Sequence, residues 1–404
     1  MSSGTSLEPA EAQPRTPALA DEAVTDDMGV RAQRWAWPAL PEAQRTTLLD
    51  VLVHGNRSRA ELARRSGLSR ASLSRVTRRL VDAGLVREAG APPLEGRGRP
   101  SEMIEIVPEA ARFIGFKLTG DSLYAAVVDL GANVLHSEGQ PLVTKVVGDV
   151  VTLIEQVVDR LREQFSRVAA VGVCLAGDVR FEDRHAVVVG SAFLGWDEVP
   201  LETLLARATG LPVAVSNDVQ ALTTAHHWFG AGVGASSLAV IGLGAGIGCG
   251  IVVDGELVKG AHGHPAKVGH LPVTSEGPRC DMGHVGCASA YVTIPAILRN
   301  TGGAGFWESL AAARGGDERA DAAFRQAGTA LGAVIAVLVN IVDPERVIVT
   351  GEGLAIAEYA SDEMTTALAA RLDPVSEAPA VQLRTFHFTD YAWGAAITAI
   401  RNLI

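Results

Sequence analysis

A short segment of this 404-residue chain carries histidine and cysteine at a spacing suited to a metal ion. Cys280, His284 and Cys287 lie close together, and His270 precedes Cys280 by ten residues. Thiolate and imidazole are the ligands that Zn²⁺ prefers, and four such donors can close a tetrahedral structural site. A pair of buried thiols with incidental histidines is the alternative. The spacing alone leaves both interpretations open.

Two further motifs place chemistry where strands are predicted to end. Asn217 and Asp218 follow a predicted strand, and Asp218 is a candidate general base for a hydroxyl group. Asn and Asp at such positions more often cap helices. Between residues 242 and 250 glycine occupies every second position, which lets a backbone approach a phosphate closely. The same pattern also serves tight strand packing, so neither motif is decisive by itself.

Residues 68–88 contain arginines in a pattern that suits nucleic acid. Leu73, Val76 and Leu80 recur at helical spacing and predict one buried face. The rest of residues 69–80 carries four arginines and no acid, whereas a solvated helix face usually mixes both signs. Arginine pairs with phosphate and guanine, so this helix is predicted to lie in a DNA groove. The predicted DNA contacts are Arg70, Ser72 and Arg75 at base edges and Arg78 and Arg79 at phosphates.

The preceding segments argue against an incidentally basic surface helix. Ser58 and Glu61 form a capping-box pattern at the start of a short helix. Gly67 supplies the turn of a helix-turn-helix, and Ser69 caps the arginine-rich helix. Residues 44–54 predict a further packing helix. The predicted order of helices is that of a DNA-binding head.

The following segment predicts a wing. Residues 85–88 and 103–107 read as two short strands, with a glycine- and proline-rich connection between them. At its tip Arg97 and Arg99 alternate with glycine, which suits entry into a narrow minor groove. Residues 42–107 are therefore predicted to form a winged helix-turn-helix domain.

Charge separates this head from the rest of the chain. The net charge of the whole chain is −11, yet residues 42–107 carry twelve arginines against eight acidic residues. Residues 1–41 are rich in Ala, Pro, Glu, Asp, Ser and Thr and are predicted to be a disordered tail. A basic head on an acidic body indicates that only the head contacts nucleic acid.

Cysteine content and hydropathy indicate the cellular compartment in which the protein is expected. Four cysteines are too few for a disulfide scaffold in a chain of this length. We recognise neither a signal peptide nor an apolar run of membrane length, so a cytoplasmic protein without a membrane partner is expected.

From residue 112 onward predicted strands and helices alternate in two successive series. The first contains strands over residues 113–118, 123–129, 134–141, 169–176 and 213–216, and helices over 150–165 and 218–228. The second contains strands over residues 237–241, 248–253, 257–259 and 346–350, and a helix over 327–342. This pattern predicts an α/β effector domain over residues 108–404, with lobes at about 108–235 and 236–404 and a cleft between them.

Taken together, residues 42–404 resemble the ROK family, which comprises repressors and sugar kinases with an actin-like ATPase fold. The most specific segments are residues 243–263, 268–287 and 340–354. The resemblance implies a two-lobed kinase-like fold, self-association, and a zinc held by His270, Cys280 and Cys287. The family's middle cysteine is Met282 here, a weak donor, so His284 is expected to complete the zinc site.

The first phosphate loop departs from the kinase pattern. The resemblance implies Asp-x-Gly-Gly-Thr there, to hold ATP phosphates and Mg²⁺. This chain has Lys117 in place of the acid and Leu118 where backbone must approach phosphate. We therefore expect no phosphoryl transfer, with Asp218 a vestigial base.

The sugar-binding positions implied by the resemblance have also changed. Phe193 stands for an asparagine, and Lys267 and Ser289 stand for glutamates, while Asn217 and Asp218 remain. A site built for hydroxyls loses about 10⁴-fold or more when its partners are mismatched. An ordinary hexose is therefore not the expected ligand, and Lys267 favours an anionic one. The expected effector-binding residues are Asn217, Asp218, Lys267 and His270.

The predicted function is a DNA-binding transcriptional regulator, a repressor, that senses a small metabolite through a degenerate sugar-kinase-like domain. One short helix reads few bases, so we expect a homodimer or dimer of dimers on a palindromic double-stranded operator. Two alternatives remain: an active sugar kinase with a DNA-binding head, and a ligand-free regulator controlled by a protein partner.

Overall fold

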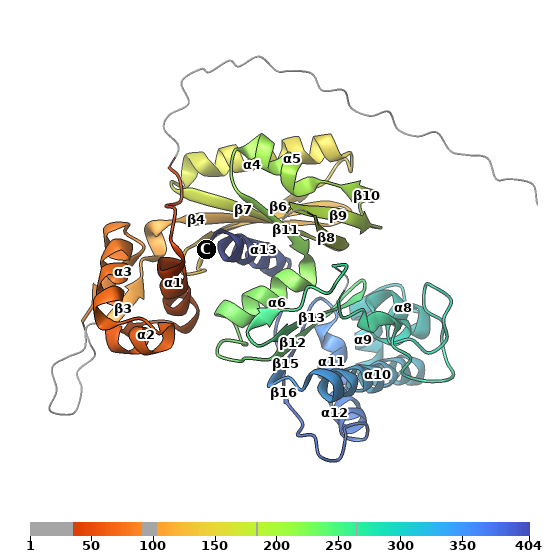
Figure 1. Cartoon of the computed structure of the whole chain (residues 1–404). Coiled ribbons are helices and arrows are strands. Elements are labelled where there is room, and N and C mark those ends of the chain that lie inside the picture. The colour runs from red at the N-terminus through yellow and green to blue at the C-terminus, as the bar shows by residue number, and fades with distance from the viewer. Residues whose placement is uncertain (1–34, 91–102, 183–184, 264) are drawn as a thin grey trace, which may run out of the picture. The chain divides into compact units, whose positions relative to one another are not determined.

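The N-terminal head in the computed structural model combines helices with a small antiparallel sheet (Figure 1). The structure describes residues 35–90, 103–182, 185–263 and 265–404. The head contains α1 (Glu42–His54), β1 (Arg57–Ser58), α2 (Arg59–Ser66), α3 (Arg70–Asp82), β2 (Val86–Ala89) and β3 (Met103–Ile106), with strand order β1-β3-β2. This is the predicted winged helix-turn-helix. The wing tip with Arg97 and Arg99, like the predicted disordered tail up to residue 34, lies outside the described residues.

Side-chain caps fix where the head helices begin. The Ser58 hydroxyl accepts a hydrogen bond from the amide of Glu61 at 3.2 Å, and the Ser69 hydroxyl accepts one from the amide of Ser72 at 3.2 Å. Gly67, with φ of +67°, ends α2 in the left-handed conformation that glycine adopts at low cost. The carboxylate of Glu61 turns to Arg57 at 3.3 Å. The predicted caps Ser58 and Ser69 therefore set these boundaries, whereas the second half of the predicted capping box, from Glu61 back to the cap, is replaced by the ion pair with Arg57.

The first lobe is built on a five-stranded sheet. Its strands are β4 (Arg112–Leu118), β5 (Ser122–Asp129), β6 (Val134–Pro141), β7 (Val168–Leu175) and β11 (Val213–Asn217), in the order β11-β7-β4-β5-β6. Helices α4 (Val147–Gln164) and α5 (Leu201–Thr209) lie on one face, and α13 (Phe388–Leu403) packs on the other (Figure 1). All residues of β7 are buried, as expected for a parallel strand covered on both faces. The short helix η1 (Pro108–Ala110) precedes β4.

A small antiparallel sheet extends the first lobe towards the cleft described below. It contains β8 (Asp178–Glu182), β9 (His185–Ser191) and β10 (Trp196–Val199), in the order β10-β9-β8. These strands were not predicted from the sequence, since β8 and β10 are short and carry charged residues.

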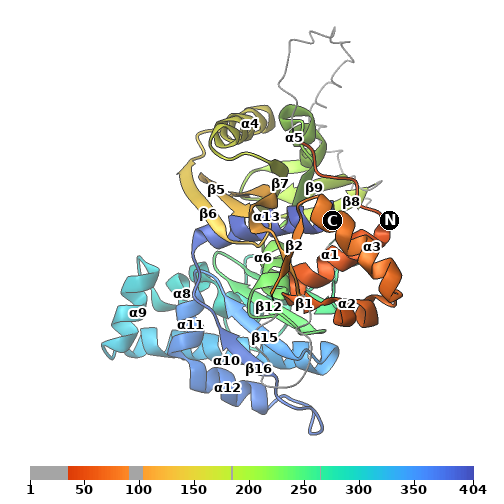
Figure 2. The ribbon, with the colours of Figure 1, turned by 90° about the vertical axis from the view of Figure 1, so that its left-hand side faces the viewer.

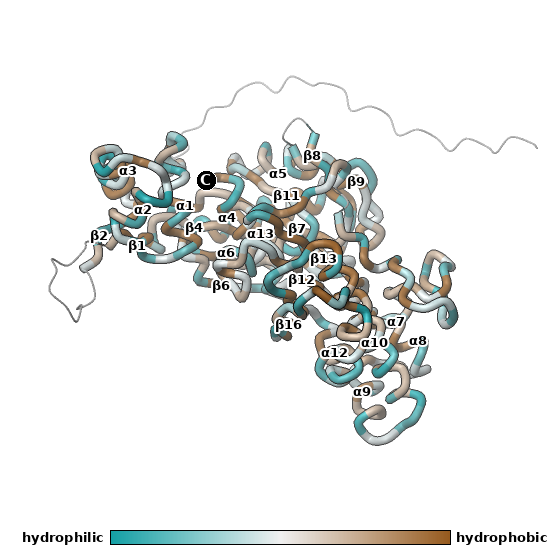
Figure 3. The backbone as a smooth tube through the Cα atoms, turned by 60° about the horizontal axis from the view of Figure 1, so that its bottom comes forward, coloured by the Kyte–Doolittle hydropathy of each residue, from teal (hydrophilic) through white to brown (hydrophobic). Residues whose placement is uncertain are grey.

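The second lobe contains another five-stranded sheet. Its strands are β12 (Leu238–Leu243), β13 (Ile247–Val253), β14 (Glu256–Leu257), β15 (Arg346–Thr350) and β16 (Ala380–Leu383), in the order β14-β13-β12-β15-β16. Its helices are η2 (Val268–His270), α7 (Ser289–Val292), α8 (Ile294–Thr301), α9 (Phe306–Arg314), α10 (Glu318–Val342), α11 (Leu354–Tyr359) and α12 (Ser361–Ala369). Strand β12 is coloured as hydrophobic in Figure 3, which agrees with the burial of all its residues, whereas β13 is only partly buried.

Two helices form a layer between the sheets. Helix α6 (Asp218–Phe229) packs on β12 and β13, and it also packs on α13, which covers the first sheet (Figure 2). Small residues permit this close packing: a Cβ added at Gly394 of α13 would lie 2.9 Å from the Ala221 carbonyl oxygen of α6. The chain therefore returns to its first lobe at its end. The expectation that the second lobe runs unbroken to residue 404 was wrong for α13.

Helix α10 corrects a second expectation. It is long and apolar enough, by length and composition, to cross a membrane, so the statement that no segment reaches this length was wrong. Within the described residues, 72% of its most apolar 18-residue stretch is buried inside the protein. It is the central core helix of the second lobe, packed against α8, α9, α11 and α12.

Candidate functional site

Helix α3 presents a basic surface above a small buried face. Leu73, Thr77 and Leu80 are buried, and the Thr77 hydroxyl donates to the Leu73 carbonyl at 3.0 Å. Thr77 therefore replaces the predicted Val76 at the centre of the packing face, because satisfying its hydroxyl within the helix lets it be buried. Arg70, Arg75, Arg78 and Arg79 are exposed, as predicted. Ser72 is half-buried, and its hydroxyl bonds to that of Ser69 at 3.0 Å.

Four other arginines of the head differ from those on α3, whereas the exposed Arg64 of α2 forms no ion pair among the described residues either. Arg57, Arg59, Arg65 and Arg87 form ion pairs with Glu61, Glu88, Asp50 and Glu105 respectively. Among the described residues, none of the four α3 arginines forms such a pair. An unpaired guanidinium keeps its donors available for phosphate oxygens and base edges. This contrast within one domain identifies α3 as the candidate nucleic-acid surface.

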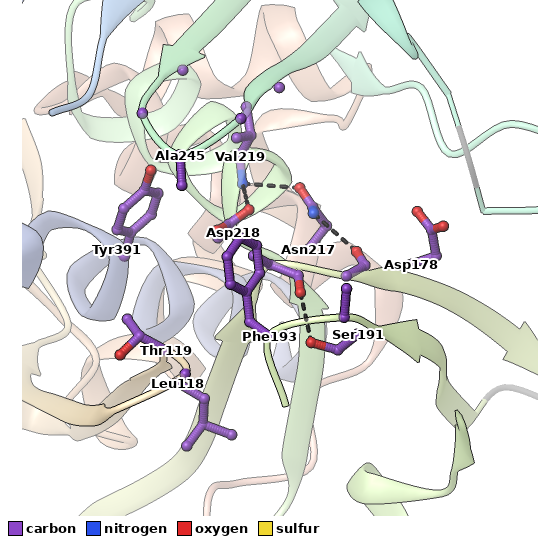
Figure 4. Close-up of a pocket in the computed structure, with 18 of the residues that line it drawn as sticks. Leu118, Thr119, Asp178, Ser191, Phe193, Asn217, Asp218, Val219, Ala245 and Tyr391 are labelled. Atoms are coloured by element: carbon purple, nitrogen blue, oxygen red, sulfur yellow. Dashed lines mark hydrogen bonds between the residues drawn. The ribbon is translucent and has the colours of Figure 1, made fainter. Parts of the chain in front are cut away.

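A cleft of about 1140 Å³ lies in the α/β part of the chain. Strand β4, the 190–196 loop and the end of β11 line it from the first lobe, and the glycine turn at 244–246 and residues 265–270 line it from the second. Figure 4 shows Phe193, Asn217, Asp218, Ala245 and Tyr391 around this space. The cleft collects residues from many elements, as ligand sites between lobes commonly do.

Lys117 and Asp218 form a buried ion pair in this cleft. The ammonium of Lys117, on β4, donates to one carboxylate oxygen of Asp218, at the start of α6. The other oxygen of Asp218 accepts from the amide of Val219 at 2.9 Å. The ring of Tyr391, on α13, lies 4.3 Å from the same ammonium. Both oxygens of Asp218 are therefore engaged, and its charge is neutralised within the protein.

Asn217 acts as a helix cap. Its side-chain carbonyl accepts from the amides of Val219 at 2.9 Å and Gln220 at 3.3 Å, and its amide donates to the Gly177 carbonyl at 3.0 Å (Figure 4). Of the two interpretations of Asn217, capping is the one that these bonds support. A ligand hydroxyl at Asn217 would share atoms that already have partners.

Lys267 also has an internal partner. Its ammonium donates to Asp178 of β8, 89 residues earlier in the chain. The pair joins a loop of the second lobe to the small sheet of the first. Asp178 balances the charge of Lys267 in this half-exposed pair, so the argument that a lone positive charge selects an anionic ligand loses its support.

The remaining substituted positions leave an apolar wall and an isolated hydroxyl. Phe193 is 50% exposed and lines the cleft (Figure 4). The Ser289 hydroxyl is buried and has no hydrogen-bond partner among the described residues. Glu352 also lines the cleft, with one buried carboxyl oxygen that lacks such a partner. Phe193 and Ser289 thus differ in shape and charge from the amide and the carboxylate that the family resemblance implies at these positions.

The histidine and cysteine segment forms a compact set of donors. One ligand atom from each of His270, Cys280, His284 and Cys287 lies within 4.8 Å of the others. The Cys280 sulfur is 3.7 Å from His270 Nδ1, and tetrahedral zinc ligands are separated by about 3.4–3.8 Å. Burial and the neighbouring Cys280 raise the pKa of the Cys287 thiol, which a bound cation would counteract. The donor set fits Zn²⁺, whereas the Met282 side chain is 68% exposed.

The structure brings the two candidate sites of the effector domain together. His270 is both one of the metal donors and part of the cleft lining, with Asn217, Asp218 and Lys267 in the same lining. Sequence reasoning missed Asp178 and Tyr391, because their roles arise only from contacts with distant segments. Glu352 lies within residues 340–354, one of the segments that carry the family resemblance, but the sequence assigned it no role.

Models of two protein families match the chain. The ROK family model matches residues 113–401, and a MarR family model matches residues 40–98. The first match covers the α/β part, and the second covers the head and part of the wing.

Known relatives with similar sequences are transcriptional repressors. The chain is 26% identical over 321 residues to the DNA-binding transcriptional repressor Mlc of Escherichia coli, covering 75% of this chain and 78% of that protein. It is 24% identical over 263 residues to the xylose repressor of Bacillus spizizenii, covering 64% of this chain and 67% of that protein.

Solved structures with the same fold include a regulator and kinases. A ROK family transcriptional regulator, homologous to the E. coli MLC protein, matches with a TM-score of 0.77 at 25% identity, over 89% of this chain and 96% of that one. A ROK family glucokinase from Streptomyces griseus, solved with glucose and AMPPNP, matches with a TM-score of 0.62 at 27% identity, over 72% of this chain and 100% of that one.

Proposed function

The chain belongs to the ROK family, and from this membership we propose that it is a DNA-binding transcriptional repressor with a metabolite-sensing effector domain. The observation that carries the proposal is the set of exposed α3 arginines without acidic partners among the described residues. The MarR-like head and the repressors among its relatives support it. We assign DNA binding to residues 42–107 and effector binding to residues 108–404.

The α3 surface suggests how the operator is read. Arg70, Ser72 and Arg75, near the start of the helix, are assigned to base edges, and Arg78 and Arg79 to phosphates. Arg97 and Arg99 of the wing are assigned to the minor groove on sequence grounds alone. A single α3 contacts few base pairs, so the proposal includes a homodimer or dimer of dimers on a palindromic operator.

The same chain is proposed to lack kinase activity. A catalytic base must have a free oxygen for the acceptor hydroxyl, and both oxygens of Asp218 have internal partners. Lys117 stands where an acid would serve Mg²⁺, and an ammonium cannot coordinate a cation. The cleft is therefore assigned to binding and not to phosphoryl transfer.

The effector is proposed to bind in this cleft, near Asn217, Asp218, Lys267 and His270. Phe193 and Ser289 support a ligand other than an ordinary hexose, because they replace groups that would pair with sugar hydroxyls. The paired state of Lys267 removes the reason to expect an anion. Neutral ligands with an apolar face therefore take priority.

A structural zinc is proposed at His270, Cys280, His284 and Cys287. When bound, the ion would supply a rigid crosslink between η2 and the following loop. This crosslink would hold His270, and Ser289 next to the ligand segment, at the edge of the cleft. Zinc would thereby support the effector site without entering any reaction.

The experiment that tests this function is a footprint of the full chain on DNA upstream of its own gene and neighbouring genes, followed by a metabolite screen for altered binding. A protected palindrome that a neutral metabolite releases is the expected result. No sequence-specific protection would contradict the regulator.

A coupled ADP-release assay with glucose, N-acetylglucosamine and N-acetylmannosamine tests the kinase alternative. We expect no sugar-dependent turnover. Turnover that disappears in Asp218→Asn would instead establish a kinase.

A further inference from the structure

The turn that carries Glu352 packs directly on the glycine hairpin. The amide of Gly353 donates to the Leu243 carbonyl at 2.9 Å, at the end of β12. Gly351 has φ of +107°, and a Cβ added there would lie 2.8 Å from the Leu243 amide nitrogen. Glycine on both sides of Glu352 thus allows the two backbones to approach closely.

The side chain of Glu352 occupies the space over Gly244. A Cβ added at Gly244 would lie 3.1 Å from the carboxyl carbon of Glu352 and 3.5 Å from Oε1, and it would clash with Oε2. Gly244 begins the turn that the sequence analysis identified as able to approach a phosphate. Glu352 therefore stands against the first glycine of this turn, whose amide donates to the Gly246 carbonyl at 2.9 Å, and both Glu352 and Gly244 line the cleft.

The Glu352 carboxyl group has no ion-pair partner among the described residues, unlike other charged groups of the cleft. Lys117 pairs with Asp218 and Lys267 with Asp178, while Glu352 Oε2 is buried without a hydrogen-bond partner among the described residues. Burial raises the pKa of Glu352, and the Lys117 charge opposes this effect. Whether ionised or protonated, the carboxyl group fills volume that an incoming anion would need.

We propose that Glu352 determines the charge selectivity of the cleft: its carboxyl group takes the place of a phosphate at the Gly244–Gly246 turn and excludes nucleotides and polyphosphates. This rests on the proposed role of the cleft as a ligand site. Glycine turns attract anions through backbone amides. A carboxylate in contact with such a turn repels a second anion, since like charges in a partly buried site interact strongly.

Equilibrium binding of inorganic tripolyphosphate to the full chain, measured by calorimetry, tests the proposal. Glu352→Ala removes the carboxyl group, Glu352→Gln keeps its volume without its charge, and Glu358→Gln is the control at an exposed position on α11. We expect the wild type and Glu358→Gln to bind weakly, Glu352→Gln more tightly, and Glu352→Ala at least about tenfold more tightly than the wild type. Circular dichroism verifies that each variant is folded.

Two results would overturn the proposal: tripolyphosphate binding by the wild type that matches Glu352→Ala, or no gain in either Glu352 variant. The measurement contains no DNA, so either result leaves the assignment of the head untouched. Conversely, absence of an operator would refute the regulator whatever the tripolyphosphate affinities are.

Discussion

The ammonium group of Lys117 donates a hydrogen bond to the carboxylate of Asp218, and the two side chains are only 4% and 11% exposed. The cation lies on β4, and the carboxylate begins α6. Burying one charge without its partner is costly, whereas removing both charges together costs much less. The ion pair therefore stabilises the cleft, and the same contact engages the carboxylate that would otherwise be free to act as a catalytic base.

One single and one double substitution test this coupling. Lys117→Met should lower the free energy of unfolding by about 3–5 kcal/mol, because Asp218 is left buried and unpaired. Lys117→Met/Asp218→Asn should recover part of that loss, since Asn can still accept from Val219. Urea unfolding supplies the values, with Lys145→Met at an exposed position as the control. A Lys117→Met protein as stable as the wild type would show that the pair is not formed.

Local signals in the sequence were sufficient for the head. Ser58, Gly67 and Ser69 identify helix ends through side-chain and backbone chemistry that acts within a few residues. The strands around Phe116 and Ile241 were also predicted, because continuous apolar runs mark buried strands. Local chemistry is readable from one segment at a time.

The contacts of the cleft were not predictable in this way. Tyr391 reaches Lys117 from a helix near the end of the chain, and Asp178 reaches Lys267 across 89 residues. The charge of Lys267 suggested an anionic ligand, but its carboxylate partner lies on a strand that the sequence did not reveal. Long-range pairing decides what a charged residue is free to bind.

Zinc content provides a separate test. Elemental analysis of the purified full chain should find about one zinc per chain, because the four donors fit a tetrahedral site. Cys287→Ser and His284→Ala should each lose most of the metal, whereas Met282→Ala should retain it, since Met282 is exposed. Zinc retained in His284→Ala would remove this residue from the ligand set. A wild-type protein without zinc would support the pair of buried thiols.

His226 makes stability depend on pH. Burial lowers its pKa from 6.5 to about 4, so the unfolded chain takes up the proton first as the pH falls. The contribution of neutral, buried His226 to the free energy of unfolding is fully present above pH 6.5 and is lost as the pH falls towards 4. From this shift we expect His226→Leu to lose roughly 3 kcal/mol less stability than the wild type over that range.

Urea unfolding at several pH values measures this difference. His185→Gln, at an exposed position on β9, serves as the control and should follow the wild type. Parallel pH profiles for the wild type and His226→Leu would contradict the assignment to His226.

The affinity of the full chain for its footprinted operator, measured by fluorescence anisotropy at fixed salt, tests the central assignment most directly. Arg70→Ala and Arg75→Ala should each weaken binding by about 1–3 kcal/mol and relax specificity at one operator position. Arg87→Ala, on β2 and paired with Glu105, should change the affinity little. The account predicts that the Arg70→Ala/Arg75→Ala double variant loses specific binding; undiminished specific binding by that variant would contradict it.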